Sequence, residues 1–433
     1  MKQIGVGLLG FGTVGAGVVD GLARNHDLIR TRLGIDVVLK RIGDLDVTSD
    51  RGVKVDSAIL TTDAFEVIAD PAVDIVVELI GGCGIARKLV TAALEAGKPV
   101  VTANKKLLAE FGTEIFDLAA KKGVDIYFGA SVGGGIPIIR VLREGLAGNA
   151  IHSIHGILNG TCNYILTRME REGLPFDQVL ADAQRLGYAE ANPALDIDGF
   201  DTAHKALILA ALSYGFTTPL SSITVEGIRG LDGRDVKFAA ELGYRIKLVA
   251  TVARDGDDIE VFVAPTLVPF SHMLSSVSGV FNAVMVNSDL ADKTLYYGRG
   301  AGRAPTASTV IGDICDIARN LSAGEVRHPV VVHKTGENFR LRPATEMRNA
   351  FYLRLSVREQ PGSLGCFTSI LGKHNVSLAS VIQKNTEEDK DGAVPVVVIT
   401  HVAREADLDA ALAEIATCGV VTEQPVRLRI LGE

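Results

Sequence analysis

The sequence predicts an α/β protein with three parts: a doubly wound parallel sheet, an α+β domain after it, and a small βαββαβ domain at the C-terminal end. Apolar runs alternate with amphipathic segments over residues 1–130, strand and helix patterns mix over 131–303, and a fresh alternation starts near residue 350. A chain of 433 residues is also too long for one hydrophobic core, so several domains are expected.

Bulk composition excludes several classes of protein. Hydrophobic residues make up 47% and charged residues 22% of the chain, which is typical of a packed fold and excludes a disordered one. The net charge of −8, without any run of Lys or Arg, gives no basis for binding a nucleic-acid backbone. Nucleic acid is therefore not an expected partner.

The distribution of apolar residues and cysteines predicts the compartment. The longest apolar stretches fall far short of the roughly 20 residues that a spanning helix needs, so no membrane segment is expected. Five cysteines are scattered singly without a C-x-x-C pair, which indicates neither a disulfide framework nor a thiolate zinc site. A reducing cytoplasm fits this pattern best.

The first part is expected to hold five parallel strands with helices on both faces. The strand-like runs are residues 4–9, 36–42, 75–79, 100–102 and 125–128. A helix over 304–320 is expected to pack back on this domain, after a hinge near 298–302.

A glycine-rich turn follows the first of these strands and opens a helical pattern. Its residues are Gly10, Phe11, Gly12, Thr13, Val14 and Gly15. In such a G-x-G-x-x-G turn the first glycine permits a tight bend, the second lets the backbone approach a pyrophosphate, and the third allows close helix–strand packing. The motif alone is weak, but its position between strand and helix predicts a Rossmann-type site for a nicotinamide dinucleotide.

The end of the second strand bears on the choice of cofactor. An acidic residue there usually reads the ribose of NAD, and a basic one accommodates the phosphate of NADP. This sequence offers Arg41 and also Asp44 and Asp46. The choice between NADP and NAD therefore stays open.

Two further segments lie at carboxyl ends of strands, where doubly wound sheets bind their ligands. Gly81 follows the third strand, and Thr102, Asn104 and Lys105 follow the fourth. A lone lysine is most often a solvated surface charge, but at this edge of the sheet we expect Lys105 to contact cofactor, substrate or both.

An acidic segment leads into an apolar helix in the second part. Residues 206–212 are apolar on every face, so their helix must be buried. Asp201 and Lys205 precede them four residues apart and share one side of that helix. Such a pair is usually a surface ion pair, but the buried continuation favours a partly desolvated Lys205 suited to acid–base chemistry, with Asp201 fixing its position. Glu190 and Asp196, on the preceding loop, offer carboxylates for a cationic substrate amine.

A polar linker over 321–349 precedes the last part. The expected strands and helices there are 351–357, helix 364–374, 377–383, 393–400, helix 405–416 and 424–430. This βαββαβ order predicts a ferredoxin-like domain over 350–433.

The motifs together resemble the homoserine dehydrogenase family. In chain order they are GFGTVG (10–15), TANK (102–105), ASVGGGIP (130–137), LNGTCNYIL (158–166), LGYAEANP (186–193) and DxDGxDxxxK (196–205). The resemblance implies reversible hydride transfer between NADPH or NADH and L-aspartate 4-semialdehyde. The product is L-homoserine, on the route to threonine, methionine and isoleucine.

The resemblance also implies roles for single residues. Lys205 transfers the oxygen-bound proton, Lys105 is the second lysine of the active centre, and Asp201 is a supporting acid. Gly302 matches a glycine turn that closes over the cofactor. The substrate-binding residues implied are Glu190, Asp196, Gly160, Thr161 and Tyr188.

Members of the family can also bind a sodium ion through backbone carbonyls, which map to Val132, Gly134 and Ile136. Gly129 stands where some members have a glutamate that assists the ion. This departure leaves the cation open, since a bend between domains also accounts for the three glycines. A homodimer or homotetramer is the expected assembly.

The C-terminal part resembles an ACT domain, in which a strand-to-helix turn helps hold an amino acid between paired modules. The matching turn contains Pro361 and Gly362. Threonine is the expected effector, because it is an end product downstream of homoserine. Neither Glu359 nor Gln360 matches the usual aspartate of such turns, so a purely structural, dimerising role stays open.

Two other functions compete with this interpretation. An aspartate-semialdehyde dehydrogenase would need a nucleophilic cysteine, and Cys162, the only candidate near a motif, lacks an evident histidine partner. A regulatory amino-acid-binding protein with an inactive dehydrogenase domain is the other alternative. The presence of Lys105, Glu190, Asp201 and Lys205 argues against it.

Overall fold

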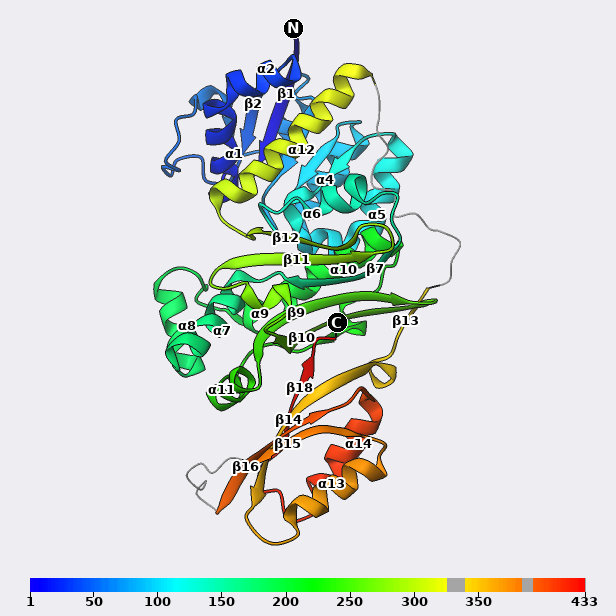
Figure 1. Ribbon diagram of the computed structural model, residues 1–433. Coiled ribbons are helices and arrows are strands. Elements are labelled where there is room, and N and C mark those ends of the chain that lie inside the picture. Colours follow the sequence, from blue (N-terminus) through cyan, green and yellow to red (C-terminus); the bar gives the residue numbers. More distant parts are fainter. Residues whose placement is uncertain (325–338, 384–391, 433) are drawn as a thin grey trace. The chain divides into compact units, whose positions relative to one another are not determined.

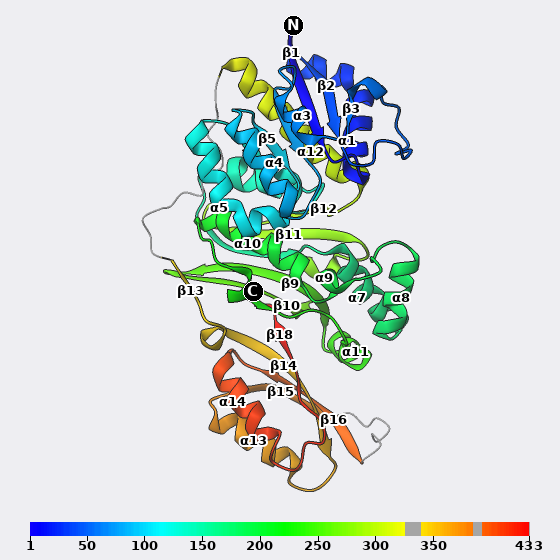
Figure 2. The same ribbon diagram turned by 180° about the vertical axis from the view of Figure 1, so that it is seen from behind.

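The computed structural model describes residues 1–324, 339–383 and 392–432, and the chain divides into two compact units. Unit 1 comprises Met1–Gly160, Thr202–Ser222 and Val280–Asn338, and unit 2 comprises Thr161–Asp201, Ile223–Gly279 and Phe339–Glu433. Figures 1 and 2 show the elements of both units from opposite sides. Parts of the expected linker (325–338) and of the expected C-terminal domain (384–391) lie outside the described residues.

Unit 1 is built on a six-stranded parallel sheet with the strand order β3-β2-β1-β4-β5-β6. The five expected strands are present, together with the short β3. Connections run outward in both directions from β1, so the glycine turn that follows β1 lies at the switch point of the sheet. The strands are β1 (Lys2–Leu9), β2 (Ile35–Gly43), β3 (Leu60–Thr61), β4 (Ile75–Glu78), β5 (Val100–Thr102) and β6 (Ile126–Tyr127).

Helices cover both faces of this sheet. One core cluster joins α1 to α12, which is the helix expected over 304–320, and another joins α3, α4 and α5 to the opposite face. The helices α1 and α12 meet at Gly17, where an added Cβ would lie 2.7 Å from the carbonyl oxygen of Arg303. The helices and turns of unit 1 are α1 (Thr13–Arg24), α2 (His26–Leu33), η1 (Ser57–Ile59), α3 (Ala64–Ala69), α4 (Gly84–Glu95), α5 (Lys105–Lys122), η2 (Gly129–Ser131), α6 (Ile138–Arg140), η3 (Val141–Gly145), α10 (Phe200–Tyr214), η4 (Leu220–Ser222) and α12 (Arg303–Ala323).

Unit 1 also contains an antiparallel group in the order β12-β11-β7. The strands are β7 (Ile151–Ile157), β11 (Phe281–Ser288) and β12 (Asp292–Arg299). Strands β11 and β12 were not expected from the sequence. Strand β12 continues to Arg299, so the hinge expected near 298–302 overlaps the end of a strand.

Unit 2 is built on strands in the order β9-β10-β18-β14-β16-β15. The parallel pairing of β10 with β18, at Thr266–Arg429 and Leu267–Ile430, joins the middle of the chain to its last strand. One sheet therefore runs from the α+β part into the C-terminal domain. The strands are β8 (Thr224–Val225), β9 (Tyr244–Asp255), β10 (Asp258–Pro269), β13 (Arg340–Leu341), β14 (Arg348–Arg358), β15 (Leu378–Gln383), β16 (Ala393–Thr400), β17 (Ala403–Arg404) and β18 (Val426–Ile430).

The C-terminal domain has the order β14-α13-β15-β16-α14-β18, which confirms the βαββαβ prediction apart from the added two-residue β17. Helices α13 and α14 pack on one face of the strands through Phe351, Leu353, Phe367 and Leu408. In the part of the chain that the structure describes, no helix is both long and apolar enough to cross a membrane. The helices and turns of unit 2 are α7 (Gly160–Glu172), α8 (Phe176–Arg185), α9 (Ala194–Ile197), α11 (Gly233–Glu241), η5 (Met273–Ser276), η6 (Ala344–Glu346), α13 (Ser363–Lys373) and α14 (Glu405–Ile415).

Candidate active site

The three glycines of the turn after β1 have three different environments. Gly10 has a φ of +98°, and an added Cβ would lie 2.8 Å from the backbone of Leu79. A Cβ on Gly15 would lie 2.1 Å from the carbonyl oxygen of Gly10, so the helix can pack on the strand only without one. A Cβ on Gly12 would meet no atom within 4 Å. Open space therefore lies beside the N-terminus of α1, where backbone N–H groups favour an anion.

The carboxylate of Asp44 and the carbonyl of Gly43, at the end of β2, fix the turn. The N–H of Phe11 donates to Asp44 Oδ2 at 2.5 Å, and the N–H of Gly10 donates to the carbonyl of Gly43 at 2.9 Å. Arg41 pairs with Asp70 at 2.8 Å, and the hydrogen bond from Arg41 helps hold the pKa of Asp70 below its ordinary value. The structure thus gives Asp44 a backbone-binding role that the sequence did not reveal, and it places Arg41 against Asp70.

Buried polar groups tie the ends of β4 and β5 together. Glu78 accepts hydrogen bonds from the hydroxyl of Thr102 at 2.6 Å and from the N–H of Gly81 at 3.0 Å. Asn104 caps α5 by accepting from the N–H of Leu107 at 3.1 Å, and it donates to the carbonyl of Gly82 at 2.6 Å. These contacts fix the point at which α5 begins, and the first residue of α5 is Lys105.

Lys205 lies on α10 and is 8% exposed. Its ammonium donates to the carbonyl oxygen of Leu158, in the LNGT segment, at 2.7 Å. Asp201, on the first turn of the same helix, is 4% exposed. The prediction that residues 206–212 lie in a buried helix is confirmed through Ala210, whereas Ala211 and Leu212 are partly exposed.

The substrate loop, which we define as residues 186–198, carries the predicted substrate carboxylates in unit 2. Its carbonyl groups rest on the start of α7: Thr161 Oγ1 donates to the carbonyl of Tyr188 at 2.7 Å, and Cys162 Sγ to that of Asp196 at 3.2 Å. Asp196 is partly buried on α9 and Glu190 is exposed. The thiol of Cys162 is buried and engaged with the loop, which suits a packing role.

The loop predicted for a cation contains two carbonyl groups that already accept hydrogen bonds. Thr309 Oγ1 donates to Gly134 at 2.7 Å, and the N–H of Ile138 donates to Ile136 at 2.8 Å. Among the described residues, no backbone N–H outside the regular helices and strands donates to the carbonyl of Val132. Gly302 has a φ of +118° and precedes α12.

A carboxylate fills the space beside Gly129. The N–H of Gly129 donates to Asp313 Oδ2 at 2.8 Å, and an added Cβ would lie 2.9 Å from Asp313 Oδ1. Burial raises the pKa of Asp313 to about 7. Asp313 lies in the middle of α12, and no spacing in the sequence connects it with Gly129.

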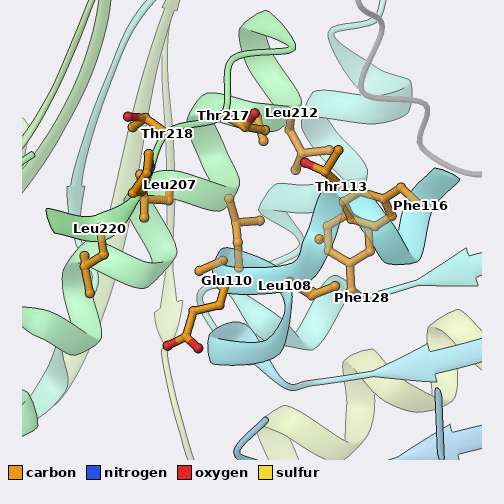
Figure 3. A pocket seen from close by; sticks show the side chains of 15 residues that line it. Leu108, Glu110, Thr113, Phe116, Phe128, Leu207, Leu212, Thr217, Thr218 and Leu220 are labelled. Atoms are coloured by element: carbon orange, nitrogen blue, oxygen red, sulfur yellow. The ribbon is translucent and has the colours of Figure 1, made fainter. Parts of the chain in front are cut away.

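A cavity of about 360 Å³ in unit 1 lies outside these motifs. Figure 3 shows Phe116 and Phe128 on one side and Leu207 and Leu220 on the other. The two phenyl rings are 5.3 Å apart. None of the residues predicted for the site lines this cavity, so we do not assign the chemistry to it.

Comparison with known proteins covers nearly the whole chain. Residues 10–129 match the NAD-binding domain of homoserine dehydrogenases, residues 137–315 the homoserine dehydrogenase family, and residues 351–419 the ACT domain. The homoserine dehydrogenase of Neisseria gonorrhoeae is 46% identical over 431 residues, which cover 99% of this chain and 98% of that protein.

Solved structures agree with this match. The crystal structure of a homoserine dehydrogenase from Thiobacillus denitrificans is similar with a TM-score of 0.93 and 43% identity, covering 100% of this chain and 99% of that chain. A hyperthermophilic archaeal homoserine dehydrogenase in complex with NADPH is similar with a TM-score of 0.63 and 28% identity, covering 75% of this chain and all of that one.

Proposed function

The chain belongs to the homoserine dehydrogenase family, and on that premise we propose which of its residues bind the ligands and transfer the proton. The reaction is the reversible NAD(P)-dependent interconversion of L-aspartate 4-semialdehyde and L-homoserine. The observation that carries our assignment is the buried side chain of Lys205, whose Nζ donates to the carbonyl oxygen of Leu158 at 2.7 Å. A lysine at such a site is fixed in place and partly desolvated, as proton transfer requires.

In the direction of homoserine oxidation, neutral Lys205 accepts the proton of the substrate hydroxyl at Nζ. An oxidised nicotinamide, when bound, would supply the hydride acceptor for the carbon that carries this hydroxyl, so that the loss of its C–H and O–H bonds leaves a carbonyl. Asp201 holds Lys205 in place from the preceding turn of α10, and Lys105 contacts the substrate or cofactor. Glu190 and Asp196 bind the substrate's ammonium group, with Gly160, Thr161 and Tyr188 shaping the pocket.

The glycine turn binds the pyrophosphate of the cofactor through the N-terminus of α1, because Gly12 leaves that approach open. Gly81, Thr102 and Asn104 border the nicotinamide end, and Gly302 borders the cofactor at the start of α12. The relative that binds NADPH supports NADP as one accepted cofactor. Arg41 can bind the 2′-phosphate of NADP only if its ion pair with Asp70 breaks. The choice of cofactor is therefore tested by comparing turnover with NAD and with NADP.

The test of the function is the absorbance of the reduced nicotinamide when purified protein is mixed with homoserine and either NAD or NADP. We expect reduction with at least one of them and reversal with aspartate semialdehyde. The absence of turnover with both cofactors, in protein that is shown to be folded, would contradict the function and favour the regulatory-protein alternative.

We also propose that the ACT domain binds threonine and that the chain forms a homodimer or homotetramer in the cytoplasm. The turn into α13 supports the first statement, since Gly362 takes the left-handed conformation with a φ of +90°. The five cysteines lie among the described residues and none of them forms a disulfide there, which fits a reducing compartment. Titration calorimetry with threonine and sedimentation velocity test the ligand and the assembly separately.

For the cation we propose that the carboxylate of Asp313 assists the ion. Some members of the family have a glutamate at the position of Gly129 for this purpose, and the carboxylate of Asp313 occupies the space beside Gly129. The carbonyl oxygens of Val132, Gly134 and Ile136 would complete the site. Sodium should then raise the Tm of the native protein relative to choline at equal ionic strength. An Asp313→Asn variant should lose that difference, and equal sodium effects on both proteins would contradict the assignment.

A further inference from the structure

The last strand of the chain reaches the segment that follows β8. Arg429, on β18, is buried and donates through Nε and one terminal nitrogen to both carboxylate oxygens of Glu405, at 2.7 and 2.9 Å. Its other terminal nitrogen donates to Glu226 Oε1 at 2.9 Å. Arg427, two residues earlier on the same strand, lies 3.5 Å from Glu226. Glu226 is therefore held by two arginines of the C-terminal domain.

Arg429 is firmly fixed in this arrangement. Burial alone would lower its pKa, but the hydrogen bonds to Glu405 and the charge of Glu226 outweigh that effect and hold the pKa above its ordinary value. Its guanidinium also lies over the ring of Phe262, 5.2 Å from the centroid. Since Glu405 is the first residue of α14, the position of Arg429 is tied to that helix.

The segment that carries Glu226 continues directly onto the substrate loop. The N–H of Glu226 donates to the carbonyl of Val263 at 2.7 Å, and the N–H of Ile228 donates to that of Ile197 at 2.7 Å. Arg229 forms a bidentate pair with the carboxylate of Asp198, at 2.7 and 2.9 Å. This pair holds the pKa of Asp198 below its ordinary value.

The contact between the two segments is too close for any side chain at residue 227. A Cβ on Gly227 would lie 2.1 Å from the carbonyl oxygen of Ile197 and 2.4 Å from the Cα of Asp198. Two main-chain segments that touch in this way move together. A displacement of Glu226 is therefore passed to Ile197 and Asp198, next to Asp196.

We propose that Glu226 is a positioning residue for the substrate loop, and that Arg429 of the C-terminal domain sets its place. The chain of contacts runs from α14 through Arg429 and Glu226 to Ile197 and Asp198, all within unit 2. It ends on the loop that carries Glu190 and Asp196, and so the inference rests on their proposed role in binding substrate. A change in the C-terminal domain therefore alters substrate affinity through this route. Cofactor affinity should not change, because the cofactor turn lies in unit 1 and outside the route.

The test uses Glu226→Gln, which keeps the shape of the side chain and removes its charge. We expect the KM for homoserine to rise about tenfold, as for a weakened charge-assisted hydrogen bond. The values of kcat and of the KM for the cofactor should stay within twofold. The matched control is Glu260→Gln: Glu260, on β10, pairs with Arg342 at 2.6 Å, and Arg342 belongs neither to the substrate loop nor to the segment of Glu226. This control should leave all three constants unchanged.

A double-mutant cycle separates positioning from a general structural effect. In an Asp198→Asn background the bidentate pair with Arg229 is already weakened. Glu226→Gln should then raise the KM for homoserine by a further factor of less than about three. Full additivity of the two substitutions would contradict the proposed route, because independent sites add.

Amide hydrogen exchange of the full chain gives a readout that needs no turnover. Glu226→Gln should speed exchange at residues 186–198, whereas Glu260→Gln should not. Unchanged exchange in this loop would overturn the inference, even in a protein that oxidises homoserine. Conversely, a native protein that fails to oxidise homoserine, while Glu226→Gln still speeds exchange at residues 186–198, would contradict the proposed function but support the positioning role of Glu226.

Discussion

Lys205 and Lys247 are both buried, yet they lie in regions of different kinds. Lys205 is 8% exposed and donates to the carbonyl of Leu158 at 2.7 Å. Lys247, on β9, is 1% exposed and donates to the carbonyl of Val277 at 2.5 Å and to Asn163 Oδ1 at 3.2 Å. Burial lowers the pKa of Lys247 to about 8.

A buried lysine does not by itself mark a catalytic group. Lys205 follows an acidic segment, shares its helix with Asp201 and bonds to the LNGT motif. Lys247 stands in an apolar strand and joins β9 to α7 and to the turn after η5. We therefore interpret Lys247 as a structural cross-link, in contrast to groups that act on ligands.

The largest effect is expected at the glycine turn. There Gly12 leaves space for a ligand, whereas Gly15 allows the helix to pack on the strand. Gly12→Val adds a side chain where a Cβ meets no protein atom within 4 Å. It should therefore weaken cofactor binding at least about 100-fold by blocking the pyrophosphate, with little change in Tm.

Gly15→Val is the matched control, because its Cβ would lie 2.1 Å from the carbonyl oxygen of Gly10. This variant should lower Tm by several degrees. Cofactor titration by fluorescence and thermal unfolding measure both effects. Tight cofactor binding by Gly12→Val would contradict the location of the site.

A smaller effect is expected from Asp313, whose pKa is raised to about 7 from an ordinary value of 3.8. Its neutral form is favoured in the folded protein, so its contribution to stability is present below about pH 4 and is lost as pH rises through about 7. Asp313→Asn should gain roughly 2–3 kcal/mol relative to the native protein between pH 5 and pH 8.

Urea unfolding of both proteins in a buffer free of sodium measures this gain. A difference in unfolding free energy that does not vary with pH would show that the carboxyl group of Asp313 does not titrate in this range.

The smallest effect is expected from Lys247→Met. The pKa of Lys247 is lowered from 10.5 to about 8, so the charged form destabilises the folded state at neutral pH and this penalty disappears as pH rises from about 8 to 10.5. The native protein should gain about 1.5 kcal/mol relative to the Met variant between pH 8 and pH 9.5. Parallel unfolding curves at the two pH values test this, and a constant difference would mean that the ammonium is better solvated than its burial indicates.

Much of the fold could be predicted because the signals were local. The alternation of strand and helix patterns predicted the parallel sheet and the βαββαβ domain. The spacing of Gly10, Gly12 and Gly15 indicated the nucleotide turn. Strands β11 and β12 were missed, since the connection between Phe281–Ser288 and Asp292–Arg299 contains neither Gly nor Pro. Their pairing with β7 depends on contacts distant in sequence.

For the proposed site, helical spacing singled out Lys205 and Asp201, and the acidic segment singled out Glu190 and Asp196; their roles stay predictions. Asp313, Glu226 and Arg429 were not singled out, because each contacts a residue far along the chain: Arg429 donates to Glu226 across 203 positions, and the N–H of Gly129 donates to Asp313 across 184. No periodicity or spacing links such pairs, and only the folded backbone brings them together.

The most direct test of the central claim, that Lys205 transfers the proton during homoserine oxidation, is kcat for Lys205→Met measured beside Lys247→Met. Both variants replace a buried lysine with the same apolar side chain. We expect kcat to fall by about 10² to 10⁴-fold in Lys205→Met and to stay within about threefold in Lys247→Met, with cofactor affinity unchanged in both. A Lys205→Met enzyme with nearly native kcat, or equal losses in the two variants, would contradict the assignment.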